Sequence, residues 1–217
     1  MIRALVFDFD GLILDTESAV IAAYGAIHAE HGIPFDEALF LRCVGHADYA
    51  FDPWRGFGPA ANRPALEAAR RRRNHQIDRE LPILPGVVAL LDAARARGLS
   101  VALASNSRHP HCEGHLARLG LLDRFAFLAC REDVVSPKPE PDLYRHVLNH
   151  FGLRGREAIA FEDSHTGSLA AKRAGLWTVA VPNVSTAHHD FSHVDVRLAS
   201  LADTTLEQLI ARFATAA

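Results

Sequence analysis

The chain of 217 residues lacks several features that would assign it to a class directly. It has no run of roughly 18 apolar residues, the length that a membrane-spanning helix needs, so we expect no membrane partner. Its three cysteines have no paired spacing, which argues against a disulfide framework and favours reduced thiols in a cytoplasmic protein. Its net charge of −3 includes no excess of positive charge, so we expect no nucleic acid as its main partner.

Lysine is scarce as well. Lysine and arginine together number 23, yet only Lys138 and Lys172 are lysines, so the remaining 21 are arginines. An ammonium group is a compact point charge and a guanidinium group is a planar fork, so the two are not equivalent at a binding site. A lysine in a chain that otherwise uses arginine is therefore a candidate functional residue. We single out Lys138, and we expect Lys172, in the middle of a predicted helix, to be exposed.

The composition, with 49% apolar and 23% charged residues, is typical of a soluble globular protein. Short apolar runs, typical of strands buried on both faces of a parallel sheet, alternate with helical patterns. The predicted strands are residues 2–7, 100–104, 126–129, 158–161, 178–181 and 196–199. The predicted helices between and after them are residues 87–97, 111–119, 141–151, 167–174 and 206–213.

This alternation predicts an α/β fold, a Rossmann-like parallel sheet with helices on both faces. One region has no strand pattern and contains three helical patterns instead, at residues 18–30, 35–42 and 64–79. We therefore expect a discontinuous sheet domain, residues 1–15 and 82–217, with an inserted all-helical domain of residues 16–81.

Polar side chains follow four of the predicted strands. In chain order they are Asp8 and Asp10, Ser105 and Asn106, Lys138, and Glu162 and Asp163. Ligands of open parallel sheets bind at the edge where the carboxyl ends of the strands meet, so we expect these side chains to lie together. Four carboxylates repel one another unless a cation neutralises them, and Mg²⁺ prefers carboxylate, phosphate and water oxygens. The pattern predicts a site for Mg²⁺ and a phosphate group, with Asp8 as nucleophile and Asp10 as general acid and base.

Four segments carry a family resemblance: "DFDGLILDT", "ASNS", "SPKPEPD" and "FEDSHTGSLAAKRAG". They resemble the four ordered motifs of the haloacid dehalogenase-like hydrolase superfamily. The helical insert after the first motif resembles the cap domain of its β-phosphoglucomutase-like and phosphoglycolate phosphatase-like branch. The resemblance covers the whole chain and implies a catalytic core with an inserted helical cap.

The resemblance also implies a role for each site residue. Asp8 is the nucleophile and a metal ligand, and Asp10 is the general acid and base and binds the metal through its backbone carbonyl. Ser105 and Lys138 hold the phosphoryl group, with Asn106 assisting. Asp163 ligates Mg²⁺, and Glu162 orders the metal or its waters. A cis peptide bond at Lys138–Pro139 is a further expectation from the family.

Two histidine-containing segments have alternative interpretations. "CVGHADYAF", residues 43–51, corresponds to the cap loop that meets the substrate in this branch, so Gly45 and His46 are candidate substrate-binding residues, or part of a plain loop. "HPHCEGH", residues 109–115, places His111 and His115 four residues apart with Cys112 nearby, a pattern also found in zinc sites. Because no second pair of ligands follows, we favour a solvated helix face.

Enzymes of this superfamily with other activities differ from this chain at a few identifiable positions. Dehalogenases of the superfamily carry tyrosine at the position of Asp10, and phosphonatases use a cap lysine, which this cap lacks. β-Phosphoglucomutase has histidine at the position of Val20 and arginine near Asp48. We therefore expect a Mg²⁺-dependent phosphomonoesterase that forms an aspartyl-phosphate, acts on a small phosphorylated metabolite such as a sugar phosphate or phosphoglycolate, and is a monomer or weak dimer. A mutase is the alternative, and a non-catalytic binding module on the same fold is the alternative from another class.

Overall fold

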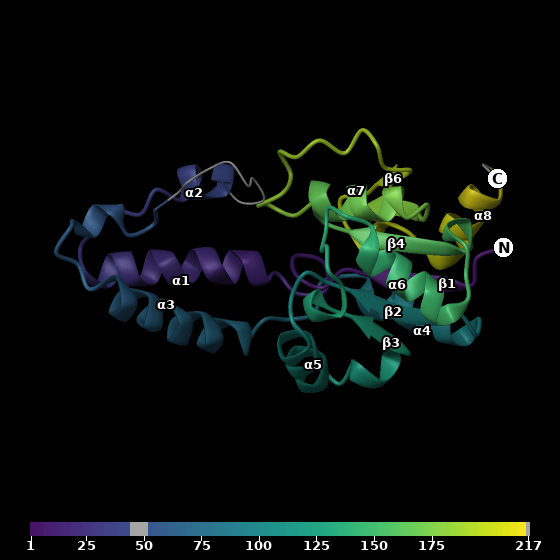
Figure 1. Cartoon of the computed structure of the whole chain (residues 1–217), viewed down its shortest axis with the longest axis horizontal. Helices are drawn as coiled ribbons and strands as arrows, with labels where there is room; N and C mark the ends of the chain where they lie inside the picture. The colour runs from purple at the N-terminus through teal and green to yellow at the C-terminus, as the bar shows by residue number, and fades with distance from the viewer. Residues whose placement is uncertain (44–51, 216–217) are drawn as a thin grey trace. The chain divides into compact units, whose positions relative to one another are not determined.

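The computed structural model describes residues 1–43 and 52–215, which form two compact units (Figure 1). One unit comprises Met1–Leu14 and Ile83–Ala217 and contains the sheet, and the other, Asp15–Pro82, is helical. The sequence placed the boundaries at residues 15 and 81, and the folding of the two units as separate domains stays a prediction. None of the helices that the structure describes is both long and apolar enough to span a bilayer.

The sheet has six strands in the order β3-β2-β1-β4-β5-β6, and every neighbouring pair is parallel. The strands are β1 Ala4–Phe7, β2 Ser100–Ala104, β3 Phe127–Ala129, β4 Ala158–Glu162, β5 Trp177–Ala180 and β6 Val196–Arg197. Phe7 of β1 pairs with Leu103 of β2 on one side and with Phe161 of β4 on the other. The predicted parallel α/β fold is confirmed, and the next residues along these strands, Asp8, Ala104 and Glu162, reach the same edge of the sheet.

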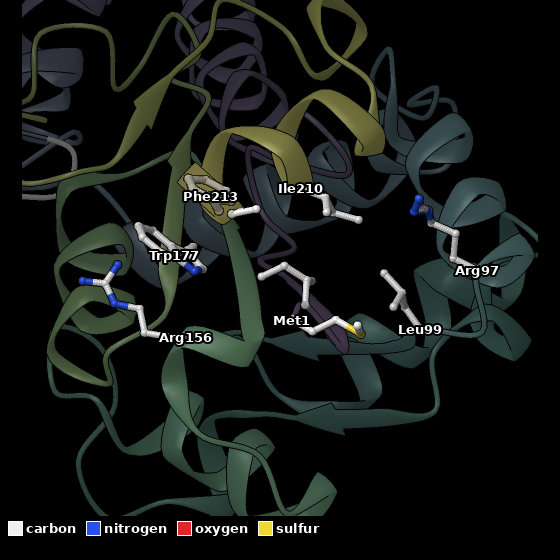
Figure 2. Close-up of a pocket in the computed structure, with 9 residues that line it drawn as sticks. Met1, Arg97, Leu99, Arg156, Trp177, Ile210 and Phe213 are labelled. Atoms are coloured by element: carbon white, nitrogen blue, oxygen red, sulfur yellow. The ribbon is translucent and has the colours of Figure 1, made fainter. Parts of the chain in front are cut away.

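The amino ends of the strands form the opposite edge of the sheet. A cavity of about 600 Å³ lies there, between Ile2, Leu99 and Trp177 and the C-terminal helix α8, Leu206–Thr215. Figure 2 shows Ile210 and Phe213 of α8 on its wall. Ile2 and Leu99 precede β1 and β2, and Trp177 is the first residue of β5, so this cavity lies at the amino ends of the strands and does not belong to the predicted site.

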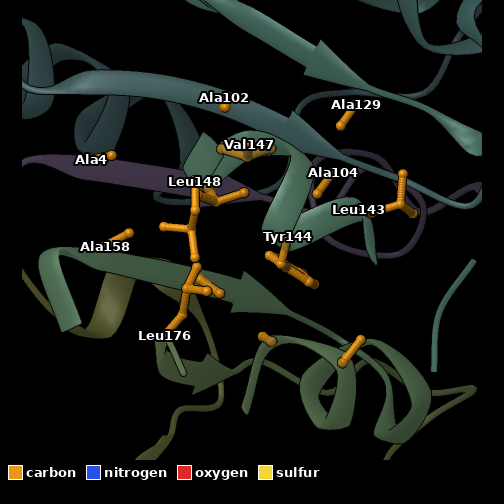
Figure 3. Packing of buried hydrophobic residues seen from close by; sticks show 14 residues of the cluster. Ala4, Ala102, Ala104, Ala129, Leu143, Tyr144, Val147, Leu148, Ala158 and Leu176 are labelled. Atoms are coloured by element: carbon orange, nitrogen blue, oxygen red, sulfur yellow. The ribbon is translucent and has the colours of Figure 1, made fainter. Parts of the chain in front are cut away.

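Four further helices belong to the sheet unit: α4 Val87–Ala96, α5 His109–Arg118, α6 Asp142–Phe151 and α7 His165–Arg173. Single turns of 3₁₀ helix, Leu122–Arg124, Arg131–Asp133, Gly155–Glu157 and Leu201–Asp203, lie in the connections. Successive side chains of a strand point to opposite faces, so Ala4 and Val6 share one face of β1. On this face α6 packs through Tyr144 and Val147 against small residues of the sheet (Figure 3).

One expectation about a surface residue is wrong. Lys172 of α7 is not a freely exposed side chain, because its ammonium group lies 2.9 Å from both carboxylate oxygens of Asp195 and its side chain is only 24% exposed. The same carboxylate accepts a bond from the backbone N–H of Thr178 at the start of β5. Lys172 thus stabilises the position of Asp195, the residue before β6, beside the start of β5.

The helical unit contains α1 Thr16–Glu30, α2 Glu37–Cys43, the 3₁₀ turn Arg55–Phe57 and α3 Arg63–Asp78. The long helices begin at side-chain caps, because Asp15 accepts a bond from the N–H of Ser18 and Asn62 accepts one from the N–H of Ala65. Helices α1 and α3 pack together over a core that contains Ile27, Trp54 and Leu66.

Candidate active site

Three buried carboxylates meet at the carboxyl ends of β1 and β4. Asp8 follows β1 directly, Glu162 ends β4, and Asp163 comes next; they are 7%, 0% and 2% exposed. One oxygen from each lies within 4.8 Å of the others. The parallel register explains this meeting, since Phe7 and Phe161 are partners and the next residue of each strand reaches the same edge. Among the described residues, no other group of three acids, histidines or cysteines comes this close.

Lys138 enters this cluster from the loop after β3. Its ammonium group donates to Asp8 Oδ1 at 2.6 Å, to Glu162 Oε1 at 2.5 Å and to the carbonyl of Ala104 at 2.7 Å. These three acceptors use the three N–H donors of a lysine, which explains how its side chain stays charged while only 4% exposed. The Lys138–Pro139 peptide bond is cis, as the resemblance implied.

The side chain of Asn106 holds the backbone of Lys138 on both sides. Asn106 Oδ1 accepts from the Lys138 N–H at 2.9 Å, and Nδ2 donates to the Lys138 carbonyl at 3.1 Å. Ser105 is 1% exposed and accepts a bond from the N–H of Ser107 at 3.0 Å, so it stabilises the turn after β2. The structure thus places Asn106 against the backbone of Lys138 and Ser105 in the turn after β2, and the contact of either residue with a substrate stays a prediction.

Burial and neighbouring charges shift the pKa values of Asp8 and Lys138 in this cluster. Burial raises the pKa of Asp8 to about 8; Lys138 opposes this rise, while Glu162 and Asp10 add to it. Burial would lower the pKa of Lys138, but Asp8 and Glu162 together raise it above its usual value. Three carboxylates and one ammonium leave an excess of negative charge, which only a proton or a cation can offset.

Glu162 is enclosed by protein on both oxygens. Its Oε1 accepts bonds from Lys138 and from the hydroxyl of Tyr144, and its Oε2 lies 3.5 Å from Ser164 Oγ. A Cβ atom on Gly167 would lie 2.0 Å from Oε2, so the backbone of α7 lies directly against this oxygen. This arrangement fixes Lys138 through Glu162, and a contact between Glu162 and a metal stays a prediction. Tyr144, on the inner face of α6, was missed because only strand ends were searched.

Asp163 is held by a residue that the sequence analysis did not consider. Asn183 Nδ2 donates to Asp163 Oδ2 at 2.9 Å and to the Gly11 carbonyl at 3.2 Å. Gly11 has φ +77°, and a Cβ atom there would lie 2.3 Å from Asp163 Oδ2, so glycine is required at this turn. Asn183 follows β5, and a search of this fifth strand end would have found it.

Asp10 is held by the segment after β2. Ser107 Oγ lies 2.6 Å from Asp10 Oδ2, and His111 Nε2 lies 3.0 Å from Asp10 Oδ1. The interpretation of residues 109–115 as a merely solvated helix face is therefore wrong for His111. The periodicity of the helix did not reveal this contact, because it depends on how α5 packs beside the loop after β1. Gly45 and His46 lie outside the described residues.

Comparisons with known proteins show the family to which this chain belongs. The family model for haloacid dehalogenase-like hydrolases matches residues 2–175. YhcW of Bacillus subtilis (strain 168), which carries the name of a phosphatase, is 39% identical over 214 residues, 97% of each chain. Hexitol phosphatase B of Escherichia coli (strain K12) is 31% identical over 219 residues, 96% of this chain and 97% of its own.

A solved structure agrees with the fold and with the sequence comparisons. CbbY from Rhodobacter sphaeroides in complex with phosphate superposes with a TM-score of 0.73 at 28% identity, covering 97% of this chain and 100% of its own. The family match and the two relatives above 30% identity together cover almost the whole chain. The chain therefore belongs to the haloacid dehalogenase-like hydrolase family, as a phosphatase of that family.

Proposed function

We propose that this phosphatase hydrolyses small phosphate monoesters with the help of Mg²⁺ and through an aspartyl-phosphate on Asp8. The observation that carries the proposal is the buried cluster of Asp8, Lys138, Glu162 and Asp163 at the carboxyl edge of the sheet. A purely structural ion pair would not need two further buried carboxylates beside it, because each uncompensated buried charge destabilises the fold.

The donor set fits Mg²⁺. Asp8 and Asp163 would hold the ion together with the backbone carbonyl of Asp10, and oxygen is the donor that this hard cation prefers. When bound, Mg²⁺ offsets negative charge at the phosphoryl oxygens and at Asp8. The cluster needs a positive charge that keeps Asp8 ionised, since burial raises the pKa of Asp8 to about 8 and a protonated carboxyl is a poor nucleophile.

The chain's own residues supply the bond-making steps. The Asp8 carboxylate attacks phosphorus, and the bond between phosphorus and the leaving oxygen breaks while Asp10 gives that oxygen a proton. Water then attacks phosphorus and passes a proton to Asp10. The bond between phosphorus and the Asp8 oxygen breaks, so inorganic phosphate leaves and the Asp8 carboxylate is restored. Lys138 and Ser105 would hold phosphoryl oxygens. All three donors of Lys138 are already engaged, so it would exchange one present acceptor for the phosphate.

The proposed substrates are sugar phosphates, polyol phosphates and similar small esters. A relative that spans the same length is named a hexitol phosphatase, and the CbbY structure contains phosphate. The mutase alternative is less well supported, because Val20 of α1 has no side chain that could bind or protonate a second phosphate ester.

Phosphate release from a panel of esters, with and without Mg²⁺, tests the proposal. We expect release that needs Mg²⁺ and that Asp8→Asn reduces to background, because the nucleophile is gone. The panel should include hexitol phosphates, several sugar phosphates, phosphoglycolate and nucleoside monophosphates. Conversion of β-glucose 1-phosphate to its 6-isomer without phosphate release would contradict hydrolysis and support the mutase.

A further inference from the structure

Both oxygens of the Asp10 carboxylate are held by residues of one segment, the turn after β2 and the first turn of α5. Ser107 Oγ donates to Oδ2 at 2.6 Å, and His111 Nε2 lies within hydrogen-bond distance of Oδ1, at 3.0 Å. A carboxylate that accepts one bond on each oxygen from two fixed donors loses its rotation about the Cβ–Cγ bond. We propose that Ser107 and His111 are positioning residues that aim Asp10 at the leaving oxygen of the substrate, a role that rests on the proposed function.

The two donors are themselves fixed by the sheet unit. The N–H of Ser107 donates to Ser105 Oγ at 3.0 Å, and its carbonyl accepts from the N–H of Arg131 at 3.0 Å, so its backbone is held from two sides. Ser105 follows β2 and Arg131 follows β3, so the turn that carries Ser107 is anchored at two strand ends. Its hydroxyl therefore reaches Asp10 from a defined direction.

The ring of His111 is held by aromatic contacts. Its centroid lies 5.5 Å from that of Phe9, in an edge-to-face arrangement, and 4.8 Å from that of His115. Phe9 is fully buried and stands between Asp8 and Asp10 in the chain, so the loop that carries both carboxylates also fixes the histidine. When Asp10 is ionised, as it must be to take a proton from water, its oxygens only accept, so Nε2 of His111 carries the hydrogen in this pair.

The role of Asp10 explains why such fixing matters. Proton transfer by a positioned group accelerates a reaction roughly 10²- to 10⁴-fold, and this gain depends on the direction of the bond to the leaving oxygen. Alcohols from sugars and polyols are poor leaving groups that need the proton, whereas 4-nitrophenolate is a good leaving group that does not. Loss of positioning should therefore weaken the hydrolysis of an alkyl ester far more than that of 4-nitrophenyl phosphate.

The test compares kcat/KM for these two esters at saturating Mg²⁺, since this constant reports the first phosphoryl transfer. We expect His111→Leu to lower kcat/KM for a hexitol phosphate about 10- to 100-fold and for 4-nitrophenyl phosphate less than about 3-fold. His111→Gln keeps an N–H donor of similar reach and should restore most of the alkyl-ester rate. Ser107→Ala, which removes the donor to the other oxygen, should show the same selective loss and serves if His111→Leu fails to fold.

His109→Gln is the matched control. It lies on the same helix, but its ring nitrogens bond to Glu113 at 2.9 Å and to Asp133 at 2.8 Å, so both rates should stay unchanged. Equal losses on both esters in the His111 and Ser107 variants, or no loss on the alkyl ester, would overturn this proposal alone. A wild-type enzyme that hydrolyses neither ester would overturn it together with the proposed function, because Asp10 would have no leaving group to protonate.

Discussion

Lys138 and Lys172, the two lysines of the chain, allow a direct comparison of a buried and a partly exposed ammonium group. Lys138→Met should lower the free energy of unfolding by about 3–5 kcal/mol, because the buried Glu162 carboxylate, and Asp8 in its ionised form, lose the cation that compensates them in the interior. Lys172→Met should cost only about 1–2 kcal/mol, because its pair with Asp195 is reached by water. Urea unfolding measures both, and similar losses in the two variants would contradict the interpretation of Lys138.

Asp8 gives the metal-free protein a dependence of stability on pH. Its pKa is about 8 in the folded chain, mainly because of burial, against 3.8 for an ordinary aspartate. Between these values the native state binds more protons than the unfolded state, so the free energy of unfolding should fall as pH rises. The slope from this one group is at most about 1.4 kcal/mol per pH unit. Urea unfolding in the presence of EDTA, from about pH 5 to pH 8, measures it.

The variant Asp8→Asn and the addition of Mg²⁺ distinguish the effect of Asp8 on the pH dependence of stability from the effects of other titrating groups. The asparagine does not titrate in this range, so the variant should lose most of the slope. Mg²⁺ favours the ionised carboxylate and should stabilise the native state more at high pH, which flattens the wild-type slope. A wild-type slope that the variant keeps would show that Asp8 is ionised in the folded chain throughout this range.

At the scale of single elements, two helical glycines should respond to alanine with opposite signs. Alanine favours a helix over glycine by roughly 1 kcal/mol, so Gly114→Ala in α5, where a Cβ atom meets nothing within 4 Å, should stabilise the protein by about 0.5–1 kcal/mol. In α7 a Cβ atom on Gly167 would lie 2.0 Å from Glu162 Oε2, so Gly167→Ala should destabilise by about 1–3 kcal/mol. Thermal unfolding of the two variants decides the signs, and a stabilised Gly167→Ala would mean that Glu162 can move.

The positions of the helices and strands could be predicted from the sequence because they depend on local hydrophobic patterns. The exact residues at which they begin and end could be predicted less well. The strand predicted at 178–181 is Trp177–Ala180, because pairing with β4 fixes its limits. The helix predicted from 167 begins at His165, because Ser164 accepts a bond from the N–H of Gly167 and caps it. Such shifts come from hydrogen bonds that a hydrophobic pattern does not contain.

The site could be predicted only where a residue follows a strand of known direction. Asp8, Glu162 and Asp163 meet because parallel strands bring their carboxyl ends to one edge, and this rule needs no detailed packing. Tyr144, Ser107 and His111 reach the same site from a helix face or a turn, and their positions depend on how those segments pack. The sequence carries no periodic signal for such contacts.

At the scale of the whole molecule, the chain leaves the sheet unit and returns to it at adjacent points. The N–H of Leu84 donates to the carbonyl of Ile13 at 2.9 Å, and both residues belong to the sheet unit. Insertions whose two junctions lie side by side can be removed with a short linker, because closing the chain then requires little rearrangement. Among the described residues, the helical unit also has a core of its own around Trp54.

A chain with residues 16–81 replaced by a short Gly-Ser linker should therefore keep the sheet and its acidic cluster. We expect this shortened chain to unfold cooperatively in urea and to give the circular dichroism spectrum of an α/β protein. It should also bind Mg²⁺ in a calorimetric titration, because the residues that would bind the metal lie in the sheet unit. The isolated segment 15–82 should unfold at a lower urea concentration, since a domain of about this size buries a smaller fraction of its surface. A shortened chain with no cooperative transition would contradict the division into separate domains and would mean that the sheet needs the helical unit to fold.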